Sequence, residues 1–175
     1  MAITQFSNHY PKISKTAFIA PSAEIIGRVS IAEDCSIWPM AVLRGDIHDI
    51  QIGARSNIQD GTICHVTHDS EYDPGGTPLM VGEDVTVGHR VILHACTIQD
   101  LCLIGMGSII LDKAMIESQV MIGAGSLVPQ GKILESGFLW LGSPIRKIRK
   151  LTGQELEFLK YSAAKYVELK NSYHK

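Results

Sequence analysis

The sequence predicts an all-β protein: a parallel β-helix of six-residue repeats with one α-helix at its C-terminal end. Two observations carry this prediction. Aliphatic residues recur at every sixth position over most of the 175 residues, and glycine, which occurs 16 times, often follows them. Short repeats of fixed length are typical of solenoids, in which each repeat supplies a strand and a turn. The pattern disfavours a helical fold, because a period of six does not match helical periodicity and frequent glycine destabilises helices.

The repeated aliphatic positions are expected to point inward and form one continuous core. Three hexapeptides make a triangular coil of about 18 residues, and successive coils lie about 4.8 Å apart, the usual spacing of paired strands. The repeated positions are Ile19, Ile25, Ile31, Ile37 and Leu43, then Ile52, Ile58 and Cys64, then Val81, Val87 and Leu93, and, after a slip of one residue, Ile98, Ile104, Ile110, Ile116, Ile122 and Val128.

Two interruptions break the period. Nine positions instead of six separate Leu43 from Ile52, which indicates a three-residue insertion near 47–49. Seventeen positions separate Cys64 from Val81, which indicates an eleven-residue loop at roughly 67–78. This loop is rich in Asp, Gly and Pro, as expected of a surface excursion.

The chain is interpreted as one domain, 1–175, in which a polar lead-in of 15 residues precedes the repeats. The β-helix is expected over about 16–140, a connector over 141–151, and a helix over 152–173. Thr152-Gly-Gln-Glu155 has the form of a capping box, which predicts a helix start. The residues after it have helical spacing and should pack against the β-helix or a neighbouring subunit: Leu156, Leu159, Ala163, Tyr166 and Val167.

Composition narrows the function. The net charge is −2 with interspersed signs, which gives no reason to expect nucleic acid as a partner. No apolar run reaches the length of a membrane span, and the N-terminus lacks the apolar core of a signal peptide. The four cysteines (Cys35, Cys64, Cys96 and Cys102) lack CxxC spacing and are interpreted as buried free thiols. A cytoplasmic protein is therefore expected.

One outward-pointing column is of particular interest. With both insertions left out of the count, the residues that follow Leu43, Cys64 and Leu93 occupy equivalent places on three successive coils. These residues are Arg44, His65 and His94. Since adjacent coils lie about 4.8 Å apart, His65 and His94 can converge on one metal ion at about 2.0–2.1 Å.

A second column, on the preceding face, holds Asp60 and His89. His89 is too far from the first column to complete a metal site within the same chain. In a threefold homotrimer the two faces of adjacent subunits can meet. His89 of the partner subunit would then complete a three-histidine site, and Arg44 would face Asp60 of the partner subunit in a charge-assisted bridge.

The remaining polar candidates are Asp46, Asn57 and Gln59, which lie near these columns. For each of them a local backbone role in a turn stands beside a functional one. The other four histidines are interpreted as ordinary surface residues: His9, His48, His68 and His174.

Several motifs together resemble the gamma-class carbonic anhydrase family, in particular its short bacterial members. The motifs are RGD at 44–46, NIQDG at 57–61, His65 and GHxxxxH at 88–94, and the match covers about 12–170. The resemblance implies a left-handed β-helix, a homotrimer, and Zn²⁺ (with Fe²⁺ or Co²⁺ as alternatives) held by His65 and His94 of one subunit and His89 of the partner subunit.

The resemblance also implies roles for individual polar residues. Arg44 and Asp60 would act at the interface, and Gln59 and Asn57 near the metal-bound water and the substrate. Asp46 of the RGD motif completes the set of candidate catalytic residues. A tyrosine of the terminal helix would line the site, and both Tyr161 and Tyr166 are candidates. The implied substrates are carbon dioxide and bicarbonate.

Three neutral imidazoles leave zinc its full charge, which lowers the pKa of a bound water to about 7 and supplies a zinc-bound hydroxide for the reversible hydration of carbon dioxide. The chain departs from the family pattern after RGD, where Ile47 and His48 replace an acidic proton shuttle. His48 and His68 are then the candidate proton carriers. The loop after His65 also carries acidic residues.

Two other functions remain open on the same scaffold. One is a metal-dependent thioesterase or an acyl-transferring hexapeptide enzyme. The other is a metal-binding trimer with a scaffolding role, because a fold alone does not determine function.

Overall fold

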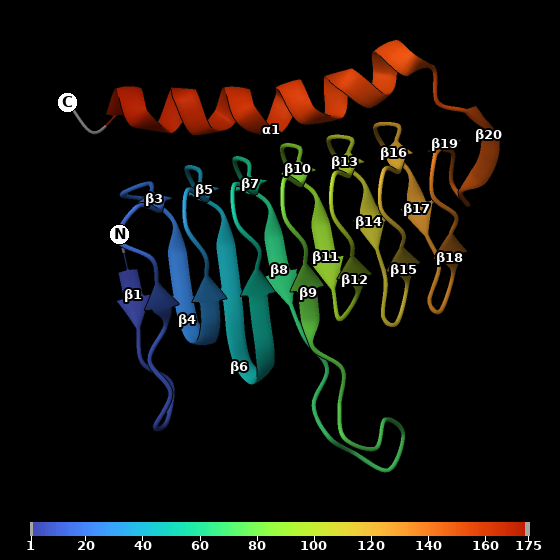
Figure 1. Ribbon diagram of the computed structural model, residues 1–175. Helices are drawn as coiled ribbons and strands as arrows, with labels where there is room; N and C mark the ends of the chain where they lie inside the picture. Colours follow the sequence, from blue (N-terminus) through green and yellow to red (C-terminus); the bar gives the residue numbers. More distant parts are fainter. Residues whose placement is uncertain (1, 174–175) are drawn as a thin grey trace.

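Short parallel strands stack into a three-sided β-helix, and one long helix lies along one of its sides (Figure 1). The computed structural model describes residues 2–173. Two sheets account for all the strands. The first sheet contains β1 (Ala2–Thr4), β2 (Lys12–Ile13), β4 (Glu24–Ile31), β6 (Val42–Ile52), β8 (Ile63–His65), β9 (Leu79–Val81), β11 (Ile92–His94), β12 (Thr97–Ile98), β14 (Ile109–Ile110), β15 (Met115–Ile116), β17 (Leu127–Val128) and β18 (Ile133–Leu134).

The second sheet forms the side of the β-helix that faces the helix. It contains β3 (Phe18–Ile19), β5 (Ser36–Ile37), β7 (Asn57–Ile58), β10 (Thr86–Val87), β13 (Leu103–Ile104), β16 (Met121–Ile122), β19 (Phe138–Leu141) and β20 (Arg146–Lys150). Helix α1 (Gly153–Tyr173) runs along this sheet and contacts β5 and β10 (Figure 1). The predicted β-helix with a C-terminal helix is confirmed.

The first sheet covers the other two sides, because β6 is long enough to turn the corner between them. The first half of β6 pairs with β8, and its second half pairs with β9. One side therefore consists of β8, β11, β14 and β17, and is called the histidine face below. The other side of this sheet begins with the second half of β6 and continues through β9, β12 and β15 to β18.

The core consists of the inward columns that the repeat predicts. One of these columns stacks six residues, all fully buried: Ile25, Leu43, Cys64, Leu93, Ile110 and Val128. Each buried aliphatic side chain contributes about 1.5–3 kcal/mol relative to exposure. This column holds the strands in register, since a slip of one residue would turn every core side chain toward solvent.

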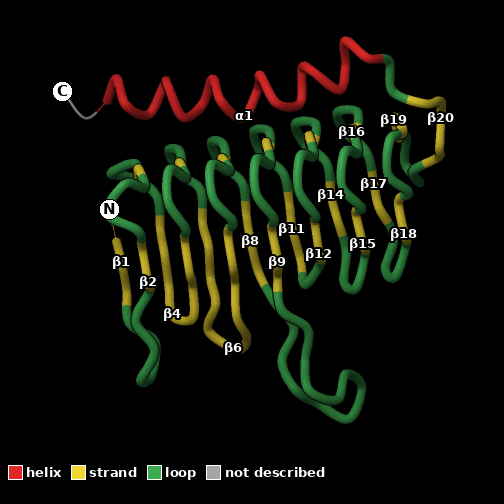
Figure 2. The backbone as a smooth tube through the Cα atoms, viewed as in Figure 1, coloured by secondary structure: helices red, strands yellow, loops and turns green. Residues whose placement is uncertain are grey.

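The two interruptions have different structures. The insertion at 47–49 does not break the strand, because β6 runs through it as a single strand of 11 residues. The register with β4 shifts at this point, between Gly27 and Val29. The second interruption forms a protruding loop between β8 and β9 (Figure 2). Backbone bridges join Thr67 to Thr77 and Ser70 to Asp73, so the loop is folded on itself.

The predicted connector at 141–151 contains a β-strand. This strand, β20, pairs antiparallel with β19 before the helix begins. The capping box is confirmed: the backbone N–H of Thr152 donates to Oε2 of Glu155 at 2.8 Å, and the N–H of Glu155 donates to Oγ1 of Thr152 at 3.2 Å. Leu159 and Ala163 are buried as expected. Lys170 is also buried, and its Nζ forms an ion pair with Oδ1 of Asp34 at 3.0 Å.

The cysteines confirm a further expectation, since all four are buried and free. Burial raises the pKa of Cys35 to about 11 and those of Cys64 and Cys102 to about 12. Within residues 2–173, no helix has both the length and the apolarity that a membrane span requires.

Candidate metal site

The histidine face brings two imidazoles together. His65 and His94 end the neighbouring strands β8 and β11 and are paired in register. Nδ1 of His65 lies 3.2 Å from Nε2 of His94. Two nitrogens bound tetrahedrally to one zinc ion lie about 3.3 Å apart, given zinc–nitrogen distances of about 2.0–2.1 Å. The observed separation therefore suits two ligands of one ion.

Each imidazole is held from behind by a carboxylate. Nε2 of His65 lies 3.1 Å from Oδ1 of Asp46, and Nδ1 of His94 lies 2.8 Å from Oδ1 of Asp112. An ionised carboxylate only accepts hydrogen bonds, so the ring nitrogen that faces it carries the proton. The other nitrogen of each ring then has a free lone pair, and these two lone pairs face each other. Histidines that bind metals are commonly oriented in this way.

The pKa shifts of these groups favour the same protonation state, with a neutral His65 imidazole and ionised carboxylates. Burial lowers the pKa of His65 and, together with the nearby Arg44 guanidinium, outweighs the hydrogen bond with Asp46, which acts to raise it, so the imidazole is neutral near pH 7. Burial acts to raise the pKa of Asp46, but hydrogen bonds from Arg44 and His65 outweigh it and the net pKa is lowered. The pKa of Asp112 is also lowered, because hydrogen bonds from Thr67 and His94 outweigh burial.

His89 lies on the turn after β10, away from the other two histidines. Its Nδ1 lies 2.9 Å from Oδ2 of Asp60, the residue one coil below it, and both side chains are 47% exposed. Nδ1 donates to this carboxylate, which leaves Nε2 free. Within the described part of a single chain, no three His, Cys, Asp or Glu side chains converge as metal ligands would. The chain thus carries a histidine pair on one face and a single histidine on another.

Arg44 has a different partner within the chain from the one expected across an interface. Its guanidinium donates to Oδ2 of Asp46, so the RGD motif closes on itself. The glycine of this motif is required by a close approach, because a Cβ at Gly45 would lie 2.7 Å from the carbonyl oxygen of Arg28. Asp46 therefore bridges Arg44 and His65.

No family model matches the sequence, but several known proteins are similar to it. Protein YrdA of Escherichia coli is 57% identical over 164 residues, which are 94% of this chain and 89% of that protein. Gamma carbonic anhydrase 1, mitochondrial, of Arabidopsis thaliana is 42% identical over 159 residues, which are 91% of this chain and 58% of that protein. Carbonic anhydrase of Geobacillus kaustophilus is 43% identical over 173 residues, 99% of this chain and 91% of that protein. The chain belongs to the gamma carbonic anhydrase family.

A solved structure agrees with this assignment at the level of the fold. The hexapeptide transferase family protein from Anaplasma phagocytophilum superposes with a TM-score of 0.90 and 42% sequence identity. The match covers 98% of each chain. The β-helix of this gamma carbonic anhydrase family member is thus shared along its whole length with an experimentally determined relative.

Two of the sequence-predicted polar residues, Asn57 and Gln59, are buried. Nε2 of Gln59 donates to Oδ1 of Asn57 at 3.1 Å, and Nδ2 of Asn57 donates to Oγ1 of Thr86 at 3.1 Å. Thr86 in turn lies 3.0 Å from Oγ of Ser162 on the helix. This chain of bonds fixes the orientation of both amides and leaves Oε1 of Gln59 as the atom available to a ligand.

The helix tyrosines are distinguished by their surroundings. Tyr166 is half-buried and packs edge-on against Trp38, with ring centroids 5.6 Å apart. Burial raises the pKa of Tyr166, and the negative charge of Asp60 adds to the effect. Tyr161 is exposed and packs against Phe158, with ring centroids 6.1 Å apart. Of the two candidates, Tyr166 is the one near the predicted site residues.

Sequence reasoning missed Asp112, Thr86 and Ser162. A partial signal for Asp112 was present, because it lies 18 positions after His94, one residue past the place that the register puts above His94 on the next coil. The contact between Thr86 and Ser162 had no signal, since it depends on how α1 packs. The four histidines that were interpreted as surface residues differ in their exposure. His9 and His68 are exposed, whereas His48 is half-buried and hydrogen-bonded to the carbonyl of Gly75. His174 lies outside the described residues.

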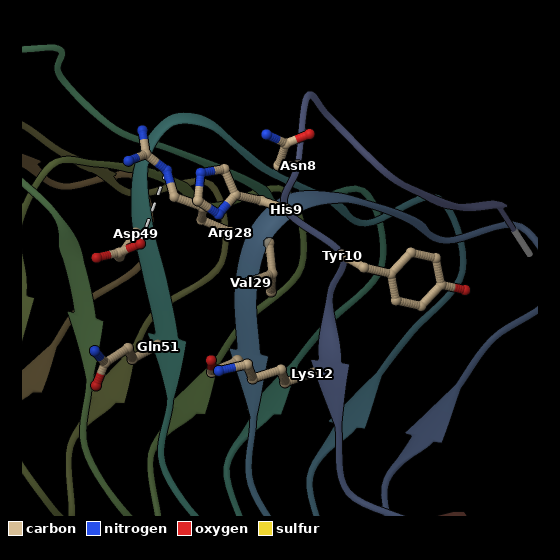
Figure 3. Close-up of a pocket in the computed structure, with 9 residues that line it drawn as sticks. Asn8, His9, Tyr10, Lys12, Arg28, Val29, Asp49 and Gln51 are labelled. Carbon is tan, nitrogen blue, oxygen red and sulfur yellow. Dashed lines mark ion pairs between the residues drawn. The ribbon is translucent and has the colours of Figure 1, made fainter.

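A separate hollow lies near the first coils and holds none of the predicted site residues (Figure 3). Its volume is about 630 Å³. Arg28, His9 and Lys12 line it together with Asp49. Nε of Arg28 is buried without a hydrogen-bond partner and lies 3.8 Å from Oδ1 of Asp49. The histidine pair itself lies outside this hollow.

Proposed function

We propose that this protein is a metal-dependent carbonic anhydrase that interconverts carbon dioxide and bicarbonate at sites shared between the subunits of a homotrimer. One observation carries the proposal. Two imidazole nitrogens face each other at 3.2 Å, and a carboxylate holds the opposite nitrogen of each ring. This arrangement has little purpose without a cation between the lone pairs, because two acceptors repel each other.

The donor set fits a metal ion that prefers nitrogen ligands. His65 and His94 would supply two ligands, and His89 of the partner subunit the third. Zinc is the proposed ion, and iron or cobalt would accept the same three imidazoles. When bound, such an ion acts as a Lewis acid that lowers the pKa of a water ligand to about 7.

The chain's own residues would prepare the site for the reaction. Asp46 and Asp112 keep the protons on the outer nitrogens of the histidine rings. Oε1 of Gln59 presents a fixed acceptor, which would select the protonated oxygen of bicarbonate. His68 is the proposed proton carrier, because it is exposed. His48 is less suited to this role, since its Nδ1 accepts from the N–H of Asp49 and its Nε2 donates to the carbonyl of Gly75.

The histidine face has the composition of a subunit interface. An outward column of aliphatic side chains stands beside His65 and His94, and its members are paired in register: Val42, Ile63, Ile92, Ile109 and Leu127. Ile63 is 46% exposed and Ile92 is 37% exposed. An apolar stripe beside polar groups is typical of surfaces that bind another protein.

Threefold closure would place this stripe against the face of the partner subunit that bears His89. Arg44 would then lie near Asp60 of the partner subunit. The proposal places the protein in the cytoplasm, where buried thiols stay reduced.

Metal content and hydration activity test the proposal together. The protein is purified anaerobically, analysed for metals, and assayed by stopped-flow hydration of carbon dioxide. His94→Ala should lose both the metal and the activity. His68→Ala, which alters an exposed histidine outside the metal set, should keep the metal. Full metal occupancy in His94→Ala would contradict the assignment of the ligands.

A second assay on the same metal-loaded sample separates the alternatives. Hydrolysis of a coenzyme A thioester without hydration of carbon dioxide would indicate a metal-dependent thioesterase. A metal-loaded trimer that is inactive in both assays would favour a scaffolding role. Either result would refute the proposed activity while leaving the metal site intact.

A further inference from the structure

We propose that Asp112 is a positioning residue for His94 and that it couples the metal site to the loop at 67–78, so that closure of the loop and metal binding stabilise each other. This inference rests on the proposed function, since it assigns a metal ion to the histidine pair. Asp112 itself belongs to none of the motifs that the sequence singled out.

Asp112 uses its two carboxylate oxygens for two different partners. Oδ1 accepts from Nδ1 of His94 at 2.8 Å, and Oδ2 accepts from the hydroxyl of Thr67. Thr67 is the first residue of the loop. The same carboxylate therefore orients a proposed metal ligand and holds the base of the loop. A rotation of this carboxylate would disturb both contacts at once.

The residue after Asp112 holds the loop at a second point. Nζ of Lys113 lies 2.7 Å from Oδ1 of Asp73, within the loop. Oδ2 of Asp73 accepts from the hydroxyl of Thr77 at 2.7 Å. Backbone bonds of 3.1 and 3.0 Å between Thr67 and Thr77 close the base of the loop. One turn of the β-helix thus grips the loop through two consecutive side chains.

The loop also contacts the segment that orients His65. Nε2 of His48 donates to the carbonyl of Gly75 at 3.2 Å. His48 lies two residues after Asp46, the carboxylate partner of His65. Gly76 allows the loop to approach His48 closely, because a Cβ there would lie 2.9 Å from Cδ2 of the His48 ring. Both carboxylates behind the histidine pair therefore belong to segments that the closed loop contacts.

The physical consequence follows from the proton on His94. Asp112 keeps this proton on Nδ1, which leaves the lone pair of Nε2 directed at Nδ1 of His65. If the loop releases Thr67, the carboxylate loses one of its two restraints and His94 is held less firmly. Loss of such an outer carboxylate typically weakens metal binding by about 10- to 100-fold. Coupling between two equilibria is reciprocal, so the bound metal must also favour the closed loop.

Two variants separate the two parts of the proposal. Asp112→Asn keeps the shape of the side chain but removes its charge, and should weaken binding of Zn²⁺ or Co²⁺ by about 10- to 100-fold. Lys113→Met releases Asp73 without touching a histidine, and should weaken metal binding severalfold. Lys15→Met replaces an exposed lysine that precedes the first repeats and should have no effect.

Two measurements are made on each folded trimer. Metal dissociation constants come from competition with a chelator. Amide hydrogen exchange of peptides that cover 67–78 is followed with and without Zn²⁺. In the wild type, Zn²⁺ should slow exchange in the loop. In Lys113→Met, exchange in the loop should be faster and the dissociation constant higher.

The possible failures are distinguishable. If Lys113→Met frees the loop but keeps the wild-type dissociation constant, the coupling is wrong. If Asp112→Asn binds metal as tightly as the wild type, Asp112 does not position His94. A variant of Asp112 that does not fold still leaves Lys113→Met to decide the coupling. A wild-type chain that takes up no metal would overturn the proposed function, and the coupling with it.

Discussion

The proposed sharing of one metal site between two subunits of a homotrimer leads to a quantitative prediction about mixed trimers. His94→Ala destroys the pair on one face, and His89→Ala removes the single histidine on the other. Each variant alone should bind no metal tightly, because every interface lacks a ligand. A mixture of the two variants should recover part of the binding, because some interfaces then combine an intact pair with an intact His89.

The expected recovery follows from the arrangement of the two faces. An interface is intact only when a His89→Ala subunit supplies the pair and a His94→Ala subunit supplies the third ligand. If subunits mix randomly in equal amounts around a closed ring, each condition holds for half of the positions, so about one quarter of the interfaces are complete. The remaining interfaces lack at least one ligand.

The assay is elemental analysis of unfolded and co-refolded mixtures, with the unmixed variants and the wild type refolded in parallel. Hydration activity should recover in the same proportion as metal. A mixture of His94→Ala with His65→Ala serves as the control, because both changes affect the same face and no interface can be complete. If the first mixture binds no more metal than its components, the site is not shared between subunits.

Three further predictions concern the helix, its cap and the thiols. Ser162→Ala should lower kcat/KM for hydration by about fivefold while the metal content stays unchanged, because a hydrogen bond of about 1 kcal/mol that helps to hold Thr86 and the Gln59 amide is lost. Ser172→Ala is the control, since this serine is exposed on the same helix. An equal loss of kcat/KM in Ser172→Ala would refute the reasoning. The Arg149 guanidinium and the N–H of Thr152 hold the pKa of Glu155 at about 2, below its ordinary 4.5. This carboxylate therefore stabilises the folded state above pH 4.5, and its contribution is lost as the pH falls toward 2. In Glu155→Gln, the helix content measured by circular dichroism should no longer show the decrease between pH 4.5 and 2 that protonation of Glu155 causes. At pH 8 the four buried thiols should resist alkylation in the native protein and all react after unfolding, as counted by mass spectrometry, whereas rapid labelling of the native protein would contradict their burial.

Much of the fold could be predicted because a six-residue period leaves little freedom. Each inward aliphatic residue must stack on the one a coil below it, so the register follows from counting. The pairing of Leu43, Cys64 and Leu93 is the outcome of that count. The neighbouring positions are then placed as well, which is why His65 and His94 could be predicted to lie side by side.

Other features could not be obtained by counting, because they depend on side-chain conformations and on packing between distant segments. Arg44 occupies the expected column, yet the direction of its guanidinium toward Asp46 is a choice among rotamers. For Asn57 and Gln59 the sequence left a local turn role open beside a functional one, since their hydrogen bonds to each other and to Thr86 depend on side-chain conformations. The strand within the connector was missed for a similar reason, because it pairs with β19 only after the chain reverses.

The sequence by itself determined the coil, its core and the columns in which the three histidines lie, because hydrophobic burial enforces one register along the whole β-helix. Only the tertiary structure decided which side chains support them. Asp112 reaches His94 from the next coil, and Thr67 reaches Asp112 from a loop that has no repeat to place it. These contacts depend on rotamers and loop closure, which hydrogen bonds and ion pairs select after the core has formed.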